Sequence, residues 1–563
     1  MLVEPNGGTI DFQDKLHGTM TFFQLVRREM ESSLSRLTTV SALGGISTTA
    51  ILSAINAGAQ AADRGRVSLW AAILFIIALI LFIQTQHYIL ITTTAEIEAI
   101  IHKLRVRLMD YVRRSELLPL EAIGRAEIVG AITRETAVLT QASNTLAFAA
   151  QGALLIICVT IYVAYLSFLA FALAVIIIGI GASLFHAKTR QLAVEQREAS
   201  KWENKLYERL TDLLDGFKEV RLNSLRSDDL FQDIVEVSRQ AANIKIRTQS
   251  ETYKRMIVLQ SSLYTLLGAV AFVVPSFATL GEGAITKIVT ALVFIVAACF
   301  GLVQSIPIVA AANAAADKIH QLETRLREIV GTAEVIPQTR QQFNRIEVRD
   351  VEFRYADRFA EAAFKVGPFN FTLNRGDLVF LTGGNGSGKS TFFKLLAGYY
   401  RPDSGEIRLD GMPVSDRTRD EYRGLIAAIF PDFHLFHKLY GIPNPDLSEV
   451  DRLLAEFKLL DKTRIIGDEF STVDLSSGQR RRLALIVSRL ENRPILLLDE
   501  WAADQDPEFR RKFYFEFLPA LNRAGITIVA ISHDDRYIDE MKVKARRLHM
   551  DEGRFIEQPP VGN

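Results

Sequence analysis

The chain has 563 residues, too many for a single hydrophobic core, so two or more domains are expected. Lys plus Arg and Asp plus Glu each total 65, and the formal net charge of zero gives no reason to expect a nucleic-acid partner. The only two cysteines, Cys158 and Cys299, are too few for a disulfide framework or a cysteine-based metal cluster.

Residues 1–36 are predicted to form a cytoplasmic lead-in with a short helix around Phe22–Arg36. This segment carries Glu4 and Asp11 and has no early apolar stretch, so it does not resemble a cleavable signal peptide. We therefore expect the first membrane span to target the chain to the membrane.

Residues 37–316 are predicted to form an all-α transmembrane domain. About 20 helical residues cross a ~30 Å hydrocarbon layer. The third charge-free segment is long enough for two helices with a turn near Ser167, so six spans are predicted. The alternative, buried core helices in a soluble protein, is disfavoured by the number and length of these segments. Segments without Asp, Glu, Lys or Arg are Leu37–Ala62, Val67–Ala95, Thr136–Ala187, Met256–Gly281 and Ile288–Ala316.

Basic residues between the predicted spans are distributed asymmetrically. Segments 96–135 and 188–255 are rich in Lys and Arg, whereas the opposite side carries only Arg64, Arg66 and Lys287. The positive-inside rule places both segments and both termini in the cytoplasm, which predicts a multi-pass membrane protein.

The two basic segments are polar but helical in period, and no proline interrupts 188–255. We expect them to continue the spans as long cytoplasmic helices, with independent helical hairpins as the alternative. Five apolar residues of the second segment have the spacing of a single helix face: Leu206, Leu210, Leu213, Phe217 and Val220.

The predicted spans contain no ionisable Asp, Glu, Lys or Arg, and so lack the intramembrane charges typical of ion and proton relays. Their polar groups are mild, as in Gln260 and Tyr264. Such groups commonly serve helix packing. Where they line a cavity, they favour a large neutral amphipathic solute.

Residues 317–342 are charged and are predicted to be a linker. From Phe343 to the end, short apolar runs alternate with helical stretches, which indicates an α/β nucleotide-binding domain over 343–563. The predicted fold is thus multidomain, with a six-span helical domain followed by an α/β P-loop domain.

Residues 383–390 match the phosphate-binding pattern G-x-x-x-x-G-K-[ST], between an apolar strand at Leu378–Leu381 and a helix. Backbone N–H groups at a helix N-terminus bind phosphate. The position between a strand and a helix therefore favours a phosphate-binding loop over a plain glycine-rich turn. We expect Lys389 to reach the β- and γ-phosphates and Ser390 to ligate Mg²⁺. The predicted nucleotide-binding residues of this loop are Gly383, Asn385, Gly386, Ser387, Gly388, Lys389, Ser390 and Thr391.

A second apolar strand, Ile495–Leu498, ends in Asp499 and Glu500. Asp499 is predicted to hold Mg²⁺ directly or through water, and Glu500 to act as the general base for the attacking water. Two acids after a strand are a weak signal alone and a strong one after a phosphate loop.

The string Leu-Ser-Ser-Gly-Gln at 475–479 precedes a helix and resembles the LSGGQ signature of the ATP-binding-cassette family, with Ser477 at the third position. The resemblance covers nearly the whole chain, in the arrangement of half-size exporters. It implies that Ser477, Gly478 and Gln479 contact the γ-phosphate held by a partner cassette. A homodimer with two composite ATP sites is therefore expected.

The same resemblance assigns three further residues. His533 follows a predicted strand and matches the switch histidine that contacts the γ-phosphate. Asp506 matches the aspartate of the loop that contacts the other cassette. Tyr355 matches the aromatic residue that stacks on adenine, and an edge-strand tyrosine is the alternative.

One position departs from the family pattern. Pro431 stands where the family has a glutamine that senses Mg²⁺ and couples to the membrane domain. Proline offers no side-chain ligand, so Asp432, one position later, is the candidate metal-ligating substitute.

Two strings, Leu214–Asn223 and Asp499–Pro507, resemble the cyclic-peptide exporter branch, which includes pyoverdine and syringomycin secretion transporters. This resemblance implies an ATPase of the bacterial inner membrane. It would use ATP and Mg²⁺ to export a peptide-like cargo, such as a nonribosomal peptide or siderophore, by alternating access. A lipid or lipid-precursor flippase is the alternative. An ATP-gated channel or regulator is less compatible with an intact Glu500 and His533.

Overall fold

The computed structural model describes residues 20–30, 34–186, 189–277, 283–330, 342–355, 364–442 and 444–557. The chain divides into two compact units, which are described separately. The helical unit comprises residues 1–109 and 126–324, and the cassette unit comprises residues 110–125 and 325–563.

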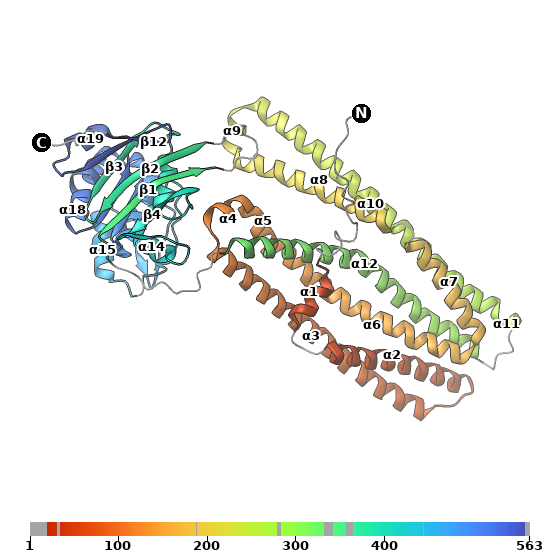
Figure 1. Ribbon diagram of the computed structural model, residues 1–563. Helices are drawn as coiled ribbons and strands as arrows, with labels where there is room; N and C mark the ends of the chain where they lie inside the picture. The colour runs from red at the N-terminus through yellow and green to blue at the C-terminus, as the bar shows by residue number, and fades with distance from the viewer. Residues whose placement is uncertain are drawn as a thin grey trace, which may run out of the picture. The chain divides into compact units, whose positions relative to one another are not determined.

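Long helices make up the helical unit, as Figure 1 shows. Within the part of the chain that the structure describes, five of them are long and apolar enough to cross a membrane, and Phe168–Ile180 adds a shorter apolar helix where the fourth span is predicted. The helices are α1 (Phe22–Glu29), α2 (Leu34–Asp63), α3 (Leu69–Arg114), α5 (Arg125–Gly130), the π-helix η2 (Ala131–Glu135), α6 (Thr136–Leu166), α7 (Phe168–His186), α8 (Thr189–Asp215), α9 (Phe217–Leu222), α10 (Ser224–Phe272), α11 (Val274–Phe277) and α12 (Ala284–Ile329).

The breaks between these helices follow local sequence. The third apolar segment divides at Ser167, whose backbone is extended, where the sequence predicts a turn. The predicted single helix face at 206–220 is wrong as one element, because α8 ends at Asp215 and Gly216 separates it from α9. Glycine is a poor helix former, which explains the position of this break.

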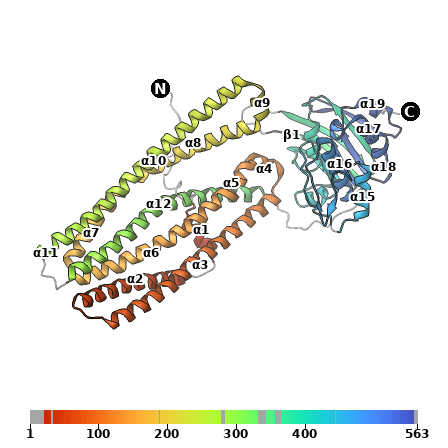
Figure 2. The same ribbon diagram turned by 180° about the vertical axis from the view of Figure 1, so that it is seen from behind.

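A single helix links the second basic segment to the next predicted span, since α10 runs unbroken for 49 residues. It packs along α8, and the two lie side by side in both views (Figures 1 and 2). Likewise α12 continues to Ile329, so the first part of the predicted linker is helical. Residues 331–341 of that linker lie outside the described residues.

The N-terminal lead-in contains one described helix, α1, capped by Thr21. Phe22 and Leu25 are each only 1% exposed, so α1 packs firmly onto the helical unit. Its Glu29 accepts a hydrogen bond from Arg107 of α3 at 2.8 Å. Arg28 and Arg107 both pair with Glu323 of α12, which joins three helices through one charged cluster.

Two β-sheets and the helices around them form most of the cassette unit. A six-stranded sheet has the order β12-β11-β3-β10-β9-β6, and a second sheet has the order β2-β1-β4-β5. Their strands are β1 (Arg345–Arg354), β2 (Lys365–Asn374), β3 (Leu378–Gly383), β4 (Ser404–Leu409), β5 (Met412–Pro413), β6 (Ile426–Ile429), β9 (Ile495–Asp499), β10 (Thr527–Ile531), β11 (Arg546–Asp551) and β12 (Arg554–Glu557).

The remaining elements are a small hairpin and short helices. They comprise β7 (Ile465–Ile466), β8 (Glu469–Phe470), α4 (Leu117–Ile123), α13 (Lys389–Leu396), α14 (Arg419–Arg423), α15 (Leu447–Glu456), α16 (Ser477–Leu490), the 3₁₀-helix η3 (Trp501–Asp504), α17 (Pro507–Lys512), the π-helix η4 (Phe513–Phe517), α18 (Leu518–Arg523) and α19 (Asp535–Glu540).

The central strands β9 and β10 are parallel and wholly buried. Alternate residues of a strand face opposite sides, so one strand contributes to two cores. Phe380 packs with Leu498 and the α15–α18 helices on one side of the sheet. Val379 packs with α13 and the second sheet on the other side. The carboxyl ends of the buried strands thereby converge at one edge.

Residues 110–125 belong to the cassette unit although they precede it by more than 200 positions in the sequence. Leu117 and Leu118 of α4 pack against the core around α13. Glu116 forms ion pairs with Arg423 and Arg419. This segment of the first predicted cytoplasmic region is thus part of the cassette's own packing.

Candidate nucleotide and metal site

The phosphate loop turns sharply from β3 into α13. Gly383 has φ +142°, and a Cβ there would lie 2.1 Å from the Met550 carbonyl oxygen, so only glycine fits. Lys389 is 5% exposed and donates to the carbonyl oxygens of Gly383 and Gly384 at 2.9 and 2.7 Å. The lysine therefore spans the loop mouth, where it is placed to contact phosphate oxygens.

Burial lowers the pKa of Lys389, and the nearby carboxylates of Glu500 and Asp499 oppose that shift. Ser387 is also buried, and its hydroxyl has no hydrogen-bond partner. An unpartnered buried hydroxyl within a phosphate loop is suited to bind a ligand oxygen. The remaining predicted loop residues, Asn385, Gly386, Gly388 and Thr391, lie in the same loop and first turn.

Asp499 ends β9 and is 2% exposed. Burial raises the pKa of its carboxyl to about 6, partly offset by a hydrogen bond from Ser390. Its Oδ2 atom is buried without a partner. A hydroxyl beside an orphaned carboxylate oxygen fits Mg²⁺, which takes few protein ligands and completes its shell with phosphate and water.

Glu500 follows Asp499 in the left-handed region, with φ 50° and ψ 36°. His533, just after β10, places Nε2 3.2 Å from Glu500 Oε1. Tyr514 supports the histidine loop by bonding to Ser532 at 2.6 Å and to Asp534 at 3.1 Å. The structure thus brings together Lys389, Ser390, Asp499, Glu500 and His533 from three separate parts of the sequence.

Tyr355 lies just beyond β1, edge-on to the ring of Phe353 at 5.1 Å between centroids. Its hydroxyl is 3.1 Å from Thr391 Oγ1, in the first turn of α13. This bond fixes the ring beside the phosphate loop. Its predicted stacking on adenine remains a prediction.

The signature residues form a second cluster. Ser476 caps α16 in a reciprocal arrangement with Gln479. A Cβ on Gly478 would lie 2.7 Å from the Asp504 carbonyl oxygen, so the loop after Glu500 sits directly against the helix. Arg482 bonds to Asp506 at 2.6 Å and to Gln505 at 2.8 Å, which fixes this loop on α16.

Asp432 follows β6, the strand that pairs with β9. It is exposed, within a turn closed by a hydrogen bond from Phe433 N to Phe430 O at 3.3 Å. Within the described part of the chain, no hydrogen bond or ion pair joins it to Asp499. Its role as a substitute metal ligand stays a prediction.

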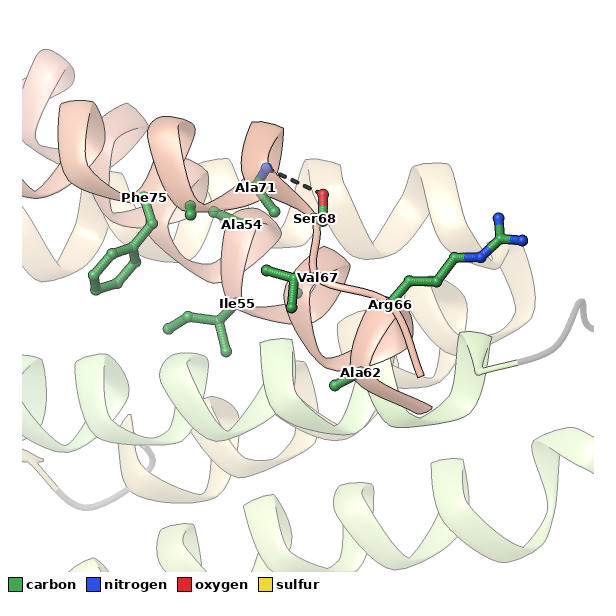
Figure 3. A pocket seen from close by; sticks show the side chains of 10 residues that line it. Ala54, Ile55, Ala62, Arg66, Val67, Ser68, Ala71 and Phe75 are labelled. Carbon is green, nitrogen blue, oxygen red and sulfur yellow. Dashed lines mark hydrogen bonds between the residues drawn. The ribbon is translucent and has the colours of Figure 1, made fainter. Parts of the chain in front are cut away.

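The helical unit contains pockets that the sequence did not predict. One, of about 410 Å³, lies between α2 and α3. Figure 3 shows the apolar side chains of Ile55, Val67 and Phe75 along it, with Arg66 extending away. A second pocket of about 410 Å³ lies between α10 and α12 and includes Gln260, which donates to the Tyr264 hydroxyl at 3.2 Å.

Sequence reasoning missed the side chains that support the site. Arg481, Trp501, Gln505 and Tyr514 carry no motif of their own, although Trp501 directly follows the predicted base. The presence of a tryptophan directly after the predicted base was the one signal in the sequence that pointed to a supporting side chain. Its partners become visible only when α16 is folded against β9.

The fold and this site define an ATP-driven membrane transporter, and the chain belongs to the ABC transporter family, whose domain matches residues 366–503. The chain is 32% identical over 448 residues to the ATP-binding protein SyrD of Pseudomonas syringae pv. syringae, covering 74% of this chain and 77% of SyrD. A bacterial Atm1-family ABC exporter with ATP bound matches with a TM-score of 0.75, 18% identity and 95% coverage of both chains.

A third relative shares less of the chain. The ATP-dependent lipid A-core flippase of Aromatoleum aromaticum is 34% identical over 236 residues, which cover 38% of this chain and 36% of that protein. The protein is therefore a multi-pass ABC exporter with a nucleotide-binding domain.

Proposed function

We propose that this exporter moves a peptide-like cargo, such as a cyclic or nonribosomal peptide or a siderophore, out of the cytoplasm. The observation that carries the cargo class is the likeness to SyrD, which extends well beyond the nucleotide-binding domain. The strings at 214–223 and 499–507 resemble the cyclic-peptide exporter branch. The charge-free spans and the α10–α12 pocket, whose polar groups are Gln260 and Tyr264, suit a large neutral solute.

We propose that Glu500 polarises the attacking water and that His533 orients Glu500 and the γ-phosphate, because the two side chains already meet. Lys389 and the loop amides would hold the β- and γ-phosphates. Ser390 and Asp499 would hold Mg²⁺, which offsets phosphate charge when bound. Tyr355 is proposed to pack against adenine.

A second copy of the chain is proposed to complete each ATP site. The signature residues and Asp506 lie in a cluster of their own, as expected if they serve a partner's nucleotide. Exposed apolar side chains on the cytoplasmic part of the helical unit also require a cover. These are Tyr207, Leu214, Phe217, Leu222, Leu225 and Phe231, all more than half exposed.

Closure of two cassettes around ATP would drive alternating access in the inner membrane, with both termini cytoplasmic. Shifting a two-state equilibrium from 1:99 to 99:1 requires about 5.5 kcal/mol of differential binding. Charge-assisted phosphate contacts contribute about 1.5–3 kcal/mol each, so two sites suffice.

The Glu500→Gln change tests the chemistry. It keeps the shape of the side chain and removes the base, so turnover should fall by at least about 100-fold while ATP binding persists. ATPase rates and nucleotide affinity of the purified full-length protein are the measurements. Wild-type turnover in this variant would refute the assignment of Glu500.

Cargo class is tested in inside-out membrane vesicles. ATP should drive uptake of a fluorescent cyclic lipopeptide, and the Glu500→Gln protein serves as the matched control. A fluorescent phospholipid flipped by the wild-type protein, with no peptide uptake, would instead support the lipid flippase. The likeness to the lipid A-core flippase makes this the second candidate, although that match covers only 38% of the chain.

A further inference from the structure

The backbone of Glu500 is strained, because a residue other than glycine adopts a left-handed conformation there. Such a conformation persists only where neighbouring groups enforce it, and it commonly serves to aim a functional side chain.

Two buried side chains supply the restraint. The guanidinium of Arg481 donates to the Glu500 carbonyl oxygen and pairs with Asp504 at 3.1 Å. The indole of Trp501 returns a bond, with Nε1 donating to the Arg481 carbonyl oxygen at 2.8 Å. Arg481 is 9% exposed and Trp501 is 1% exposed, so water does not compete for these bonds.

The tryptophan is itself immobilised. Its ring stacks on Phe513, with centroids 4.4 Å apart and planes 23° from parallel. The Arg481 carbonyl lies inside α16, where the helix already supplies a backbone N–H donor to its oxygen. The indole N–H therefore gives this oxygen a second hydrogen bond. This extra bond sets the position of Trp501 relative to α16.

We propose that Trp501 and Arg481 are positioning residues that lock the Glu500 carboxylate to the signature helix α16. The proposal rests on the base role proposed for Glu500. Since Ser477, Gly478 and Gln479 begin α16, any movement of that helix onto a partner's nucleotide is transmitted through Arg481 and Trp501 to the base of its own cassette. The two ATP sites of a dimer would thus be coupled through this link.

The test compares Trp501→Phe, Arg481→Gln, Arg481→Lys and the double variant Trp501→Phe/Arg481→Gln. Phenylalanine keeps the ring on Phe513 and removes only the N–H donor. Misplacement of a reacting group lowers rates steeply, so kcat should fall about 10- to 100-fold while KM for ATP changes by less than about twofold. The double variant should be no slower than Arg481→Gln, and Arg481→Lys should recover part of the loss.

A matched control separates positioning from stability. Phe517 is an aromatic residue of the same core, 7% exposed and stacked on Phe457 at 4.6 Å, with no contact to Glu500 among the described interactions. Phe517→Leu should lower the thermal unfolding midpoint and leave kcat unchanged. Wild-type kcat in Trp501→Phe, or an equal kcat loss in Phe517→Leu, would overturn the proposal.

The Glu500→Gln variant separates the two possible failures. If it retains turnover, the base role of Glu500 is wrong and the positioning proposal falls with it. If it abolishes turnover while Trp501→Phe and Arg481→Gln remain fast, only the positioning proposal is wrong.

Discussion

Asp499 carries the largest electrostatic penalty that the site places on a single carboxyl. Burial raises its pKa to about 6, so the folded protein binds a proton more tightly than the unfolded chain. Its contribution to stability is therefore full at low pH and is lost as the pH rises through about 6. A bound Mg²⁺ would offset this penalty, because its positive charge favours the carboxylate.

Asp499→Asn should stabilise the nucleotide-free protein while abolishing Mg²⁺-dependent turnover. A shift of about two pKa units corresponds to a gain of at most about 3 kcal/mol in the free energy of unfolding above pH 6. This gain should shrink as the pH is lowered toward about 5. The measurement is the thermal unfolding of the nucleotide-free wild-type and variant proteins, once above pH 6 and once at about pH 5. A gain that grows as the pH falls would contradict the assigned sign.

Asp506 provides a control of opposite sign. The backbone N–H of Phe509 and the guanidinium of Arg482 lower the pKa of its carboxyl. Its stabilising contribution is therefore present above the ordinary aspartate pKa and lost as the pH falls. Asp506→Asn should lower the unfolding midpoint at neutral pH, because it removes the ion pair with Arg482, whereas the asparagine oxygen can still accept the capping hydrogen bond from Phe509.

Among the elements, α4 is part of the cassette unit although it lies early in the sequence. Glu116 precedes the first turn of α4, and its side chain forms no capping hydrogen bond. The side chain instead pairs with Arg423 and Arg419. Glu121 accepts a hydrogen bond from Tyr400 at 3.2 Å. Because α3 leads directly into α4, these contacts are placed to transmit movements of the cassette.

Glu116→Gln should uncouple ATP turnover from helix movement. Loss of two ion pairs weakens the α4 contact, and partner charges left behind add to the cost. Spin labels at Arg66→Cys, with Cys158 and Cys299 replaced by serine, report the external helix ends. We expect the ATP-driven distance change to shrink while ATPase activity stays within about twofold, since Glu116 is remote from the chemistry.

Glu449→Gln is the matched control, because Glu449 pairs with Arg452 at 2.6 Å on the surface of α15. Exposed ion pairs of this kind contribute little. Equal effects of Glu116→Gln and Glu449→Gln would show that α4 has no special part in coupling.

For the whole molecule, composite ATP sites predict complementation between two defective copies. Lys389→Ala removes the phosphate contact proposed for this lysine, and Gly478→Ala forces the signature helix away from Asp504. Each homodimer should lose most turnover. A mixed dimer of the two variants keeps one intact site and should recover up to about half of the wild-type rate.

The control for this mixture places both substitutions in one chain, paired with a wild-type chain. That dimer has one lesion in each site, so it should remain as slow as the single variants. Differently tagged copies allow the mixed dimers to be purified and assayed. The reverse order of rates, with this control faster than the mixed dimer of single variants, would show that each site is built within one copy.

Much of the fold could be predicted because its signals are local. Long charge-free runs predict membrane helices, and the phosphate loop between a strand and a helix predicts the nucleotide site. The interruption at Gly216 and the helical continuation to Ile329 were not predicted, because apolar spacing shows the face of a helix and not the residue at which the helix ends. For Asp432, an exposed residue after β6, the motif comparison alone supports a metal-ligand role, and that role stays a prediction.

By itself, the sequence determined the class of protein and the chemistry of its nucleotide site. Both depend on residue types at short spacings, which local backbone geometry converts into helices and loops. Only the tertiary structure decided that Arg481 and Trp501 hold Glu500, and that α4 packs with the cassette. These contacts join residues far apart in the chain, and their geometry depends on how strands and helices pack rather than on any local pattern.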